Sequence, residues 1–346
     1  MMIIGCDFHP SWQQISWLDT ESGDCGERKL VHASGEARQF YERLVAPVLI
    51  GMEATGNSQW FIELVEDLGH TIWIGDAVQI RASYVRKQKT DRRDAEHMRR
   101  LVVEGRFPRL WTPDREQRDL RQLVLHRHKL VIIRSRVKNE LQHLSLNKGV
   151  QRKHKLWSQA GQKRLRELPL KPWAACRRED LLGLLSMLNQ QIGKLDGAVQ
   201  QAAEENPQAK LLMTQPGIGP NTALAYVLTV GDVSRFRRGK QVASYLGLIP
   251  REESSGGRQK LGAITKQGNR MLRSLLVEAA QSAVQHDPGL RKQYLHRCHR
   301  KPKGVAKVAT ARKLAVRLYW MLRTQVAYPE IVRIESSPGL SLVGAS

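Results

Sequence analysis

The chain has 346 residues, a length that predicts two or three domains. Its 56 Lys and Arg against 33 Asp and Glu give a formal net charge of +23. That excess argues against an ordinary metabolic enzyme and predicts a polyanionic partner, nucleic acid before an anionic membrane. A hydrophobic content of 41% argues against wholesale disorder, and no apolar run reaches the roughly 18 residues that a membrane span requires.

The N-terminal residues and the cysteines predict an intracellular protein. Residues 1–7 lack a basic region and reach an acid after one short apolar run, so a secretory signal peptide is not expected. The cysteines are scattered without any Cys-x-x-Cys pair, which argues against a disulfide framework or a zinc ribbon. They are Cys6, Cys25, Cys176 and Cys298.

Residues 1–112 alternate between strand-like and helix-like patterns. Short apolar or alternating runs predict strands over 2–6, 12–18, 28–32, 45–52 and 71–74. Helical spacing predicts helices over 37–44 and 58–68, the second of them ending at Gly69. Because strands with interleaved helices form a layered sheet, we expect an α/β domain in this part of the chain.

Residues 113–207 carry two apolar seams with helical spacing. One recurs every seventh residue from Leu123 to Leu144, and a stricter a/d pattern follows it. The members of the stricter seam are Leu181, Leu185, Leu188, Ile192, Leu195, Val199 and Ala202. Two such helices form either an antiparallel hairpin or a coiled coil between subunits, and both remain open. A basic connection over 148–163 is expected between them.

Residues 208–328 are predicted to be mostly helical. The segment 216–222 reads Pro-Gly-Ile-Gly-Pro-Asn-Thr and predicts a helix-hairpin-helix type of turn, whose exposed N–H groups suit a phosphate. A plain tight turn is the alternative. The amphipathic stretch from Pro288 to Pro329 contains no acid and predicts a folded basic face. A tail is expected over 329–346.

Four carboxylates stand out by their positions. Asp7 ends the first predicted strand, Glu53 ends a buried strand, and Asp91 and Asp94 share one face of a predicted helix. Each alone has an ordinary explanation, as a turn cap or as a surface acid neutralised by neighbouring arginines. Together, in a chain poor in acid, they predict an all-oxygen site for Mg²⁺ or Mn²⁺. Two such ions bind both the attacked phosphate and the leaving oxygen.

A serine and glycine loop is the next candidate for chemistry. Residues 251–258 read Arg-Glu-Glu-Ser-Ser-Gly-Gly-Arg, and a serine beside the glycine pair is predicted to be sterically open. A serine hydroxyl needs a base or a metal to become a nucleophile, and no histidine stands near in sequence. The activator would therefore come from the carboxylate site. A plain flexible loop is the alternative.

In their order and spacing these motifs resemble the DEDD transposases of the bacterial insertion-sequence 110 family, with its 1111 subgroup. The resemblance covers nearly the whole chain. Its motifs lie at 5–7, 51–56 and 89–95 in the N-terminal part and at 216–219, 245–250, 254–257 and 264–269 in the C-terminal part. Phe8 stands where a small polar residue is usual, a departure that we do not expect to disturb metal binding.

The resemblance implies an α/β RuvC-like (RNase H) domain over 1–112, a helical coiled-coil region over 113–207 and a mostly α-helical transposase domain over 208–328. It implies a bacterial protein of the cytoplasm, associated with the nucleoid and not with a membrane. A homo-oligomer, either a dimer or a tetramer, is expected, because a reaction that cuts several strands needs several active sites.

The same resemblance implies a recombinase guided by a structured non-coding RNA, which pairs with both donor and target double-stranded DNA. Its cofactor is Mg²⁺, with Mn²⁺ as the alternative. Ser255 takes the position of the nucleophile that forms a covalent phosphoserine link to DNA, and the adjacent Ser254 remains open for that role. The metal-ligand positions are Asp7, Glu53, Asp91 and Asp94.

Basic residues and the glycines of the turn mark the expected contacts with nucleic acid. Positive side chains attract the phosphate backbone, and the turn exposes backbone N–H groups to it. The expected residues are Arg92, Arg93, Gly217, Gly219, Lys266, Arg270, Lys307, Arg312 and Lys313.

Two other functions fit the basic charge. A RuvC-like nuclease or junction resolvase would use the carboxylate site without a covalent intermediate, and it would not need the serine loop because hydrolysis requires no protein nucleophile. A structural nucleic-acid-binding protein would need neither the serine loop nor the carboxylate site, and it would gain nothing from carboxylates, since they repel phosphate. The serine loop and the four acids together therefore favour a transposase.

Overall fold

The computed structural model describes residues 1–84, 90–150, 156–254, 258 and 260–336. The chain divides into two compact units, Met1–Thr112 and Pro113–Ser346, and each is described by itself. Within the described ranges no helix is both long enough and apolar enough to cross a membrane.

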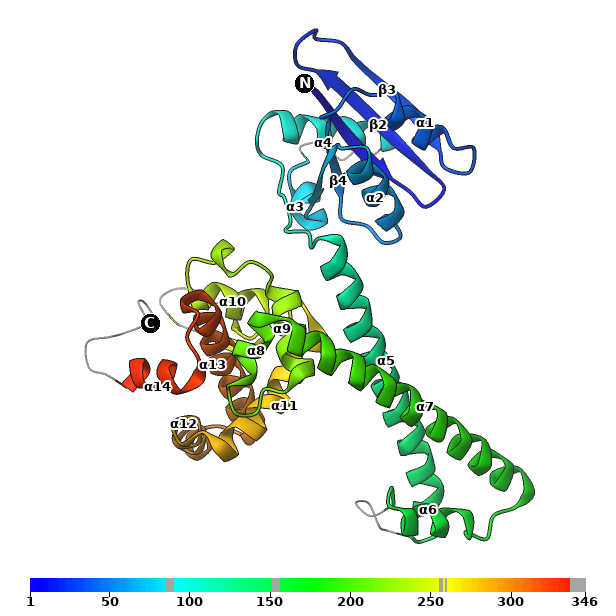
Figure 1. Ribbon diagram of the computed structural model, residues 1–346, viewed down its shortest axis with the longest axis vertical. Helices are drawn as coiled ribbons and strands as arrows, with labels where there is room; N and C mark the ends of the chain where they lie inside the picture. The colour runs from blue at the N-terminus through cyan, green and yellow to red at the C-terminus, as the bar shows by residue number, and fades with distance from the viewer. Residues whose placement is uncertain (85–89, 151–155, 255–257, 259, 337–346) are drawn as a thin grey trace. The chain divides into compact units, whose positions relative to one another are not determined.

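A five-stranded sheet organises the first unit, with the strand order β3-β2-β1-β4-β5 (Figure 1). β1 pairs antiparallel with β2 and parallel with β4. The strands are β1 (Met2–Phe8), β2 (Trp12–Asp19), β3 (Cys25–Val31), β4 (Leu49–Glu53) and β5 (Thr71–Gly75). The helices are α1 (Glu36–Glu42), α2 (Gln59–Asp67), α3 (Ala77–Ala82) and α4 (Asp91–Val103). The α/β prediction is confirmed, although α3 was not expected.

The two faces of the sheet are covered by different helices. Side chains alternate along a strand, so Ile4, Cys6 and Phe8 of β1 pack with α1 and α2 on one face. Ile3 lies on the opposite face with Met98 and other apolar residues of α4. Cys6, at the centre of β1, is fully buried.

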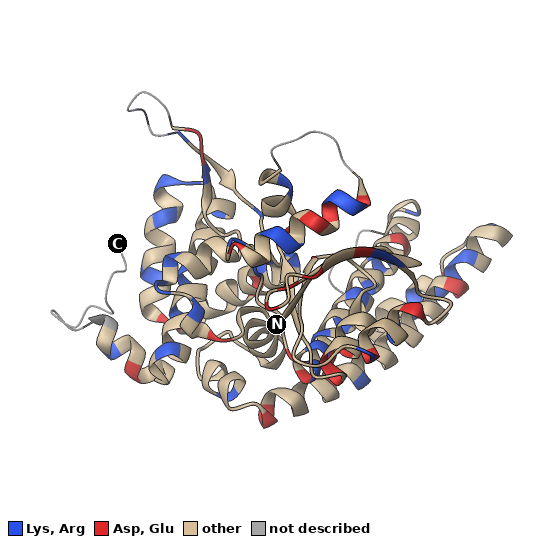
Figure 2. Ribbon diagram, turned by 90° about the horizontal axis from the view of Figure 1, so that it is seen from above, with Lys and Arg blue, Asp and Glu red and all other residues tan. Residues whose placement is uncertain are grey.

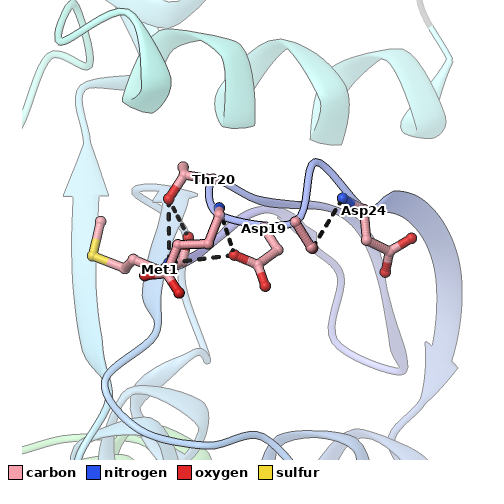
Figure 3. A network of polar contacts seen from close by, with 6 residues as sticks. Met1, Asp19, Thr20 and Asp24 are labelled. Atoms are coloured by element: carbon pink, nitrogen blue, oxygen red, sulfur yellow. Dashed lines mark hydrogen bonds and ion pairs between the residues drawn. The ribbon is translucent and has the colours of Figure 1, made fainter.

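The start of β1 is held by polar contacts to the β2–β3 turn (Figure 3). The Met1 ammonium group donates to the Asp19 carboxylate at 3.3 Å, to the Thr20 hydroxyl at 3.2 Å and to the Glu21 carboxylate at 2.9 Å. These contacts accompany the register that pairs Met2 with Asp19. They join the edge of β1 to the end of β2.

The second unit begins with two long helices, α5 (Arg115–Leu146) and α7 (Pro172–Glu205), which pack against each other. Their ion pairs run in opposite order along the chain, Arg127 with Asp196 and Glu140 with Arg177, so the pair is antiparallel. Leu185 and the neighbouring seam residues pack with α5 in one apolar cluster. The predicted seam is therefore a helix contact within the chain (Figure 1). The end of the expected connection forms α6 (Gln159–Arg166).

The remainder of the second unit is mostly helical, as predicted. It surrounds α9, which is buried from Thr222 to Val230. Its helices are α8 (Pro207–Met213), α9 (Pro220–Val230), the 3₁₀ helix η1 (Val233–Arg235), α10 (Gly239–Tyr245), α11 (Arg270–His286), α12 (Pro288–Arg300), α13 (Lys303–Thr324) and α14 (Tyr328–Ser336).

Two segments differ from the sequence expectation. Residues expected to be helical or loop-like form an antiparallel hairpin of β6 (Pro250–Glu252) and β7 (Leu261–Ile264). A tail was expected from residue 329, but residues 329–336 belong to α14, and Ile331 of this helix is fully buried in the core. That burial explains why the helix forms beyond the point where the basic stretch ends.

Candidate active site

Asp7 and Glu53 end the two central parallel strands of the first unit. The register pairs Cys6 of β1 with Met52 of β4, so the next residues along both strands reach the same edge of the sheet. Neighbouring glycines fix the face: a Cβ atom on Gly5 or Gly51 would collide with α4. Since side chains two residues apart share a face, both carboxylates project on the side that α4 covers.

Asp91 and Asp94 occupy the first turn of α4, where a carboxylate is favoured by the helix dipole. The helix begins after Thr90, whose hydroxyl accepts a hydrogen bond from the Arg93 N–H at 3.4 Å. A Cβ on Gly5 would overlap the backbone of Ala95, so the glycine lets the helix lie directly on β1. This close approach brings the first turn of the helix to the end of the strand.

The structure brings Asp7 and Asp91 together around a histidine that the sequence analysis did not single out. One donor atom each from Asp7, His9 and Asp91 lies within 4.8 Å of the other two. His9 Nε2 is 3.2 Å from an Asp7 carboxylate oxygen and 3.9 Å from an Asp91 oxygen. The spacing Asp-x-His was the signal available in the sequence.

Asp94 and Glu53 are outside that tight group and have partners of their own. The Tyr84 hydroxyl donates to the Asp94 carboxylate at 2.7 Å, and the ring of Tyr84 lies 4.1 Å from that of His97. An Arg81 guanidinium nitrogen lies 4.0 Å from Glu53. No motif in the sequence had pointed to Tyr84. It is a second residue of the site that sequence reasoning missed.

The carboxylates of the site act on one another electrostatically. Burial raises the pKa of Asp7, His9 opposes that shift, and the charges of Asp94 and Asp91 add to it. Burial and then the hydrogen bond to Asp94 raise the pKa of Tyr84, and Glu53 contributes. A divalent cation would relieve this repulsion, and carboxylate oxygens are ligands that Mg²⁺ or Mn²⁺ accepts. The residues present therefore fit such an ion.

One of the two arginines next to these acids has an ion-pair partner on the sheet. Arg92 forms an ion pair with Glu27 of β3, on a neighbouring element of the sheet. Both Arg92 and Arg93 are exposed at the start of α4. A surface pair of acids balanced by both adjacent arginines does not explain this arrangement, because Arg92 pairs with Glu27.

The serine motif lies at the β6–β7 hairpin. Ser255 and the glycine pair after it fall outside the described residues, whereas Ser254 is described. The Ser254 hydroxyl donates to the Glu252 carboxylate at 2.7 Å and accepts from the Lys260 N–H at 3.1 Å. The hydroxyl thus both donates and accepts, and its bond from the Lys260 N–H joins the two arms of the hairpin.

Two further motifs of the C-terminal part meet at the base of the same hairpin. The Thr265 N–H donates to the Ile249 carbonyl at 2.9 Å, and the Lys266 N–H donates to the Gly247 carbonyl at 3.2 Å. Lys266 and Arg270 are exposed beside this base. These backbone contacts hold the base of the β6–β7 hairpin.

The glycine turn before α9 uses its two glycines differently. Gly219 is exposed and is the N-cap residue of α9. Gly217 has a φ of +87°, and a Cβ there would press against the backbone of Ala279 and Ala283 in α11. Packing alone thus explains the glycine at 217, while Gly219 presents backbone to solvent.

The basic stretch of α12 and α13 is not all surface. Arg317 is 3% exposed, and its guanidinium donates to Asp287, which is 2% exposed, at 2.5 Å. Arg317 also donates to Gln215 at 3.3 Å. The expectation that the stretch from Pro288 to Pro329 presents its basic residues on a surface face is therefore wrong for Arg317. The partly exposed residues expected to contact nucleic acid on α13 are Lys307, Arg312 and Lys313.

Basic side chains are distributed over many helices instead of being confined to one (Figure 2). Acids and bases are interspersed along α4, which begins Asp-Arg-Arg-Asp. The excess charge of +23 is therefore a property of much of the chain.

Comparison with known proteins gives consistent matches along the chain. Residues 4–146 match a transposase family of the IS110 DEDD type, and residues 209–295 match the family described as Transposase IS116/IS110/IS902. A probable family 20 transposase of Pseudomonas aeruginosa is 30% identical over 94% of this chain and 98% of the relative's length. The transposase for insertion sequence element IS1111A of Coxiella burnetii is 28% identical over 82% of this chain and 78% of its own length.

A further relative carries a different description. The pilin gene-inverting protein of Moraxella bovis is 28% identical over 78% of this chain and 75% of its own length. Both the N-terminal and the C-terminal family matches, and a relative that spans almost the whole chain, lead to one conclusion. The chain belongs to the IS116/IS110/IS902 family of transposases.

Proposed function

We propose that this transposase cuts and rejoins donor and target DNA through metal-assisted attack of a serine, guided by a structured non-coding RNA. The observation that carries the proposal is the placement of Asp7 and Asp91 against each other where the central strand ends, with Asp94 and Glu53 in the same electrostatic neighbourhood. Sheet order β3-β2-β1-β4-β5 supports a RuvC-like fold for this unit.

The proposed roles follow from the position of each side chain. Asp7, Glu53, Asp91 and Asp94 would hold Mg²⁺ or Mn²⁺, and the bound ion would stabilise charge on the attacked phosphate and on the leaving oxygen. Tyr84 holds the Asp94 carboxylate in place, and Asp7 is partly shielded from water. The chain's own contribution is to fix these carboxylates before DNA arrives.

Serine attack would proceed in two balanced exchanges. In the first, the Ser255 oxygen forms a bond to phosphorus, the bond from phosphorus to a deoxyribose oxygen breaks, the serine proton passes to a base or to water, and the leaving oxygen takes up a proton from water. In the second, a deoxyribose hydroxyl of another strand attacks the phosphoserine and loses its proton, the bond from phosphorus to the serine oxygen breaks, and the serine hydroxyl is restored by a proton. Ser254 is engaged with Glu252 and Lys260, which supports Ser255 as the nucleophile.

The nucleic-acid partners of the proposal are double-stranded donor and target DNA and the guide RNA. The excess of basic residues supports binding to several phosphate backbones. The description of the Moraxella relatives as gene-inverting proteins supports rejoining of cut strands in addition to cutting. We propose a homo-oligomer, dimer or tetramer, because each strand that is cut requires its own active site.

A cleavage assay on labelled DNA tests the metal site. The substrate carries the ends of the element with flanking DNA, together with RNA transcribed from the element's non-coding segments. Asp7→Asn and Asp91→Asn should abolish cleavage while nucleic-acid binding persists, because these carboxylates act in the chemistry. Asp24→Asn, which changes an exposed acid of the same unit, should cleave normally. Near-normal cleavage by both site variants would contradict the proposal.

Denaturing the same reaction tests the covalent step. The intact protein should leave a protein–DNA band that maps by peptide analysis to Ser255, and Ser255→Ala should bind both nucleic acids without forming it. A band that maps to Ser254 would move the role by one residue. Efficient cleavage without any adduct would favour a hydrolytic nuclease or junction resolvase instead.

A further inference from the structure

His9 occupies a turn that fixes its direction. It follows β1, and its backbone N–H donates to the Trp12 carbonyl at 2.9 Å, which closes the turn between β1 and β2. The imidazole stacks on the Trp12 indole with ring centroids 4.1 Å apart and planes inclined by 22°. The ammonium group of Lys29 lies 4.1 Å from the centre of that indole, so the indole is held in turn by a cation–π contact.

This support directs one ring nitrogen of His9 to the carboxylates. Nε2 lies 3.2 Å from Asp7 and 3.9 Å from Asp91, two carboxylates on different elements of the unit. The three donor atoms lie within 4.8 Å of one another, a spacing that a single ion between them spans. A histidine that served only as a cap on Asp7 would not need to face Asp91 as well.

We infer that His9 is a nitrogen ligand of the ion held by Asp7 and Asp91, which makes the site a mixed nitrogen and oxygen site. The inference rests on the proposed function, since it assumes that these carboxylates hold a metal. Its chemical consequence concerns ion choice. Mg²⁺ prefers oxygen ligands alone, whereas Mn²⁺ and later divalent ions of the first transition row accept imidazole more readily. His9 would therefore favour Mn²⁺ over Mg²⁺.

Because His9 stacks on Trp12, the Trp12 indole positions the His9 imidazole. Without a flat ring beneath it, a half-exposed imidazole would sample other rotamers and lose the direction of Nε2. Trp12→Phe keeps an aromatic face, while Trp12→Leu removes it. We therefore expect Trp12→Phe to preserve the ion preference and Trp12→Leu to weaken it.

Mn²⁺ binding to the full-length protein tests the inference without any reaction. Electron paramagnetic resonance measures free Mn²⁺ during a titration, with Mg²⁺ as the competitor. His9→Gln should weaken Mn²⁺ binding by about tenfold and Mg²⁺ binding by much less, because only the nitrogen donor is lost. Electron spin-echo modulation should detect coupling between bound Mn²⁺ and a nitrogen nucleus in the intact protein and not in His9→Gln.

Two controls separate the possible failures. His143→Gln changes an exposed histidine of α5 and should alter neither affinity nor nitrogen coupling. Asp7→Asn should remove the high-affinity Mn²⁺ site; if it does not, the proposed carboxylate site itself is wrong. If Asp7→Asn removes the site while His9→Gln keeps the same Mn²⁺ to Mg²⁺ preference and the same nitrogen coupling, the carboxylate site stands and the assignment of His9 is overturned.

Discussion

The two units treat a carboxylate that the fold shields from water in opposite ways: Asp7 is partly buried and Asp287 is fully buried. In the first unit, burial raises the pKa of Asp7, and neighbouring Asp94 and Asp91 raise it further. In the second unit, burial alone would raise the pKa of Asp287, but the Leu290 N–H and the Arg317 guanidinium outweigh it and lower the pKa. One carboxylate is surrounded by like charge and the other is compensated.

This contrast separates a carboxylate that can serve chemistry from one that stabilises the fold. Asp287 caps α12 and pairs with Arg317 of α13, so it joins two helices and has its charge satisfied. Asp7 gains only a partial compensation from His9, and its surroundings become favourable once a cation is present. Charge that the fold does not compensate is the property expected of a metal site.

Breaking the compensated pair should give the largest effect on stability. Arg317→Met keeps a similar volume but leaves Asp287 buried without its cation, which should lower the free energy of unfolding by roughly 3–5 kcal/mol. Urea unfolding followed by far-ultraviolet circular dichroism measures this. As the control, Arg38→Ala removes the exposed pair with Glu42 and should cost about 0.5 kcal/mol or less. Equal effects of the two variants would contradict the comparison.

The same variant has a defined pH dependence. Because the pKa of Asp287 is lowered in the folded state, its contribution to stability is present above the ordinary value of 3.8 and is lost as the pH falls through the folded-state pKa. The difference between the intact protein and Arg317→Met should therefore shrink at acidic pH. A difference that grows on acidification would show that the pair is not what Arg317 contributes.

The next prediction concerns how the first unit assembles its carboxylates. A Cβ on Gly5 would collide with the backbone of Ala95 and Arg99, so Gly5→Ala should push α4 off β1 at a cost of about 1–3 kcal/mol. DNA cleavage should fall strongly even where the variant remains folded, because Asp91 and Asp94 move with the helix. Gly183→Ala, at an open helical position of α7, should be neutral or stabilising. Full cleavage activity in Gly5→Ala would contradict this account.

Much of the first unit could be predicted from sequence, for identifiable reasons. A short apolar run specifies β1, and a strand that ends in an acid places that acid at the edge of the sheet. The approach of Asp7 to Asp91 depends on Gly5, which lets α4 lie on β1, and the placement of Asp7 and Glu53 at one edge depends on parallel pairing of β1 with β4. Only the fold makes these two relations clear. His9 escaped notice because its direction depends on stacking with Trp12.

The second unit shows where local patterns stop being sufficient. The heptad seam predicted that α7 packs through residues such as Leu188, but the pattern is the same for a partner within the chain or in another subunit. Arg317 stands next to Leu318 on the apolar side of α13, a signal of burial that the run of basic neighbours obscured. The β6–β7 hairpin has mostly exposed residues, and so it lacks the alternation that predicts strands.

A smaller effect is expected at the Asp94 carboxylate. Tyr84→Phe removes the hydroxyl that donates to Asp94 but keeps a ring beside His97, so stability should fall by only about 0.5–1.5 kcal/mol. Mn²⁺ affinity should fall by about tenfold, because the carboxylate is no longer held in one orientation. Tyr294→Phe in α12 is the matched control. Unchanged Mn²⁺ affinity in Tyr84→Phe would show that this hydrogen bond does not position Asp94 for an ion.

The smallest expected change in the free energy of unfolding is that of Asp7→Asn, and it should be an increase, whereas Arg317→Met should cause a decrease. Because the pKa of Asp7 is raised in the folded state, the folded chain binds a proton more tightly, and stability falls as the pH rises from 3.8 through the raised pKa. At neutral pH Asp7→Asn should therefore stabilise the metal-free protein, by about 1 kcal/mol at most. Thermal melting with and without Mn²⁺ measures this, and Asp24→Asn is the control.

Addition of Mn²⁺ should reverse the order of the two proteins. The ion binds the folded state of the intact protein and raises its melting temperature increasingly as the free Mn²⁺ concentration rises, whereas Asp7→Asn has lost the ligand and should gain little. This reversal would distinguish Asp7 from Asp287, since a charge already compensated by Arg317 has nothing to gain from the ion. If Asp7→Asn instead destabilises the metal-free protein, Asp7 is a structural carboxylate like Asp287, and the contrast between the two units fails.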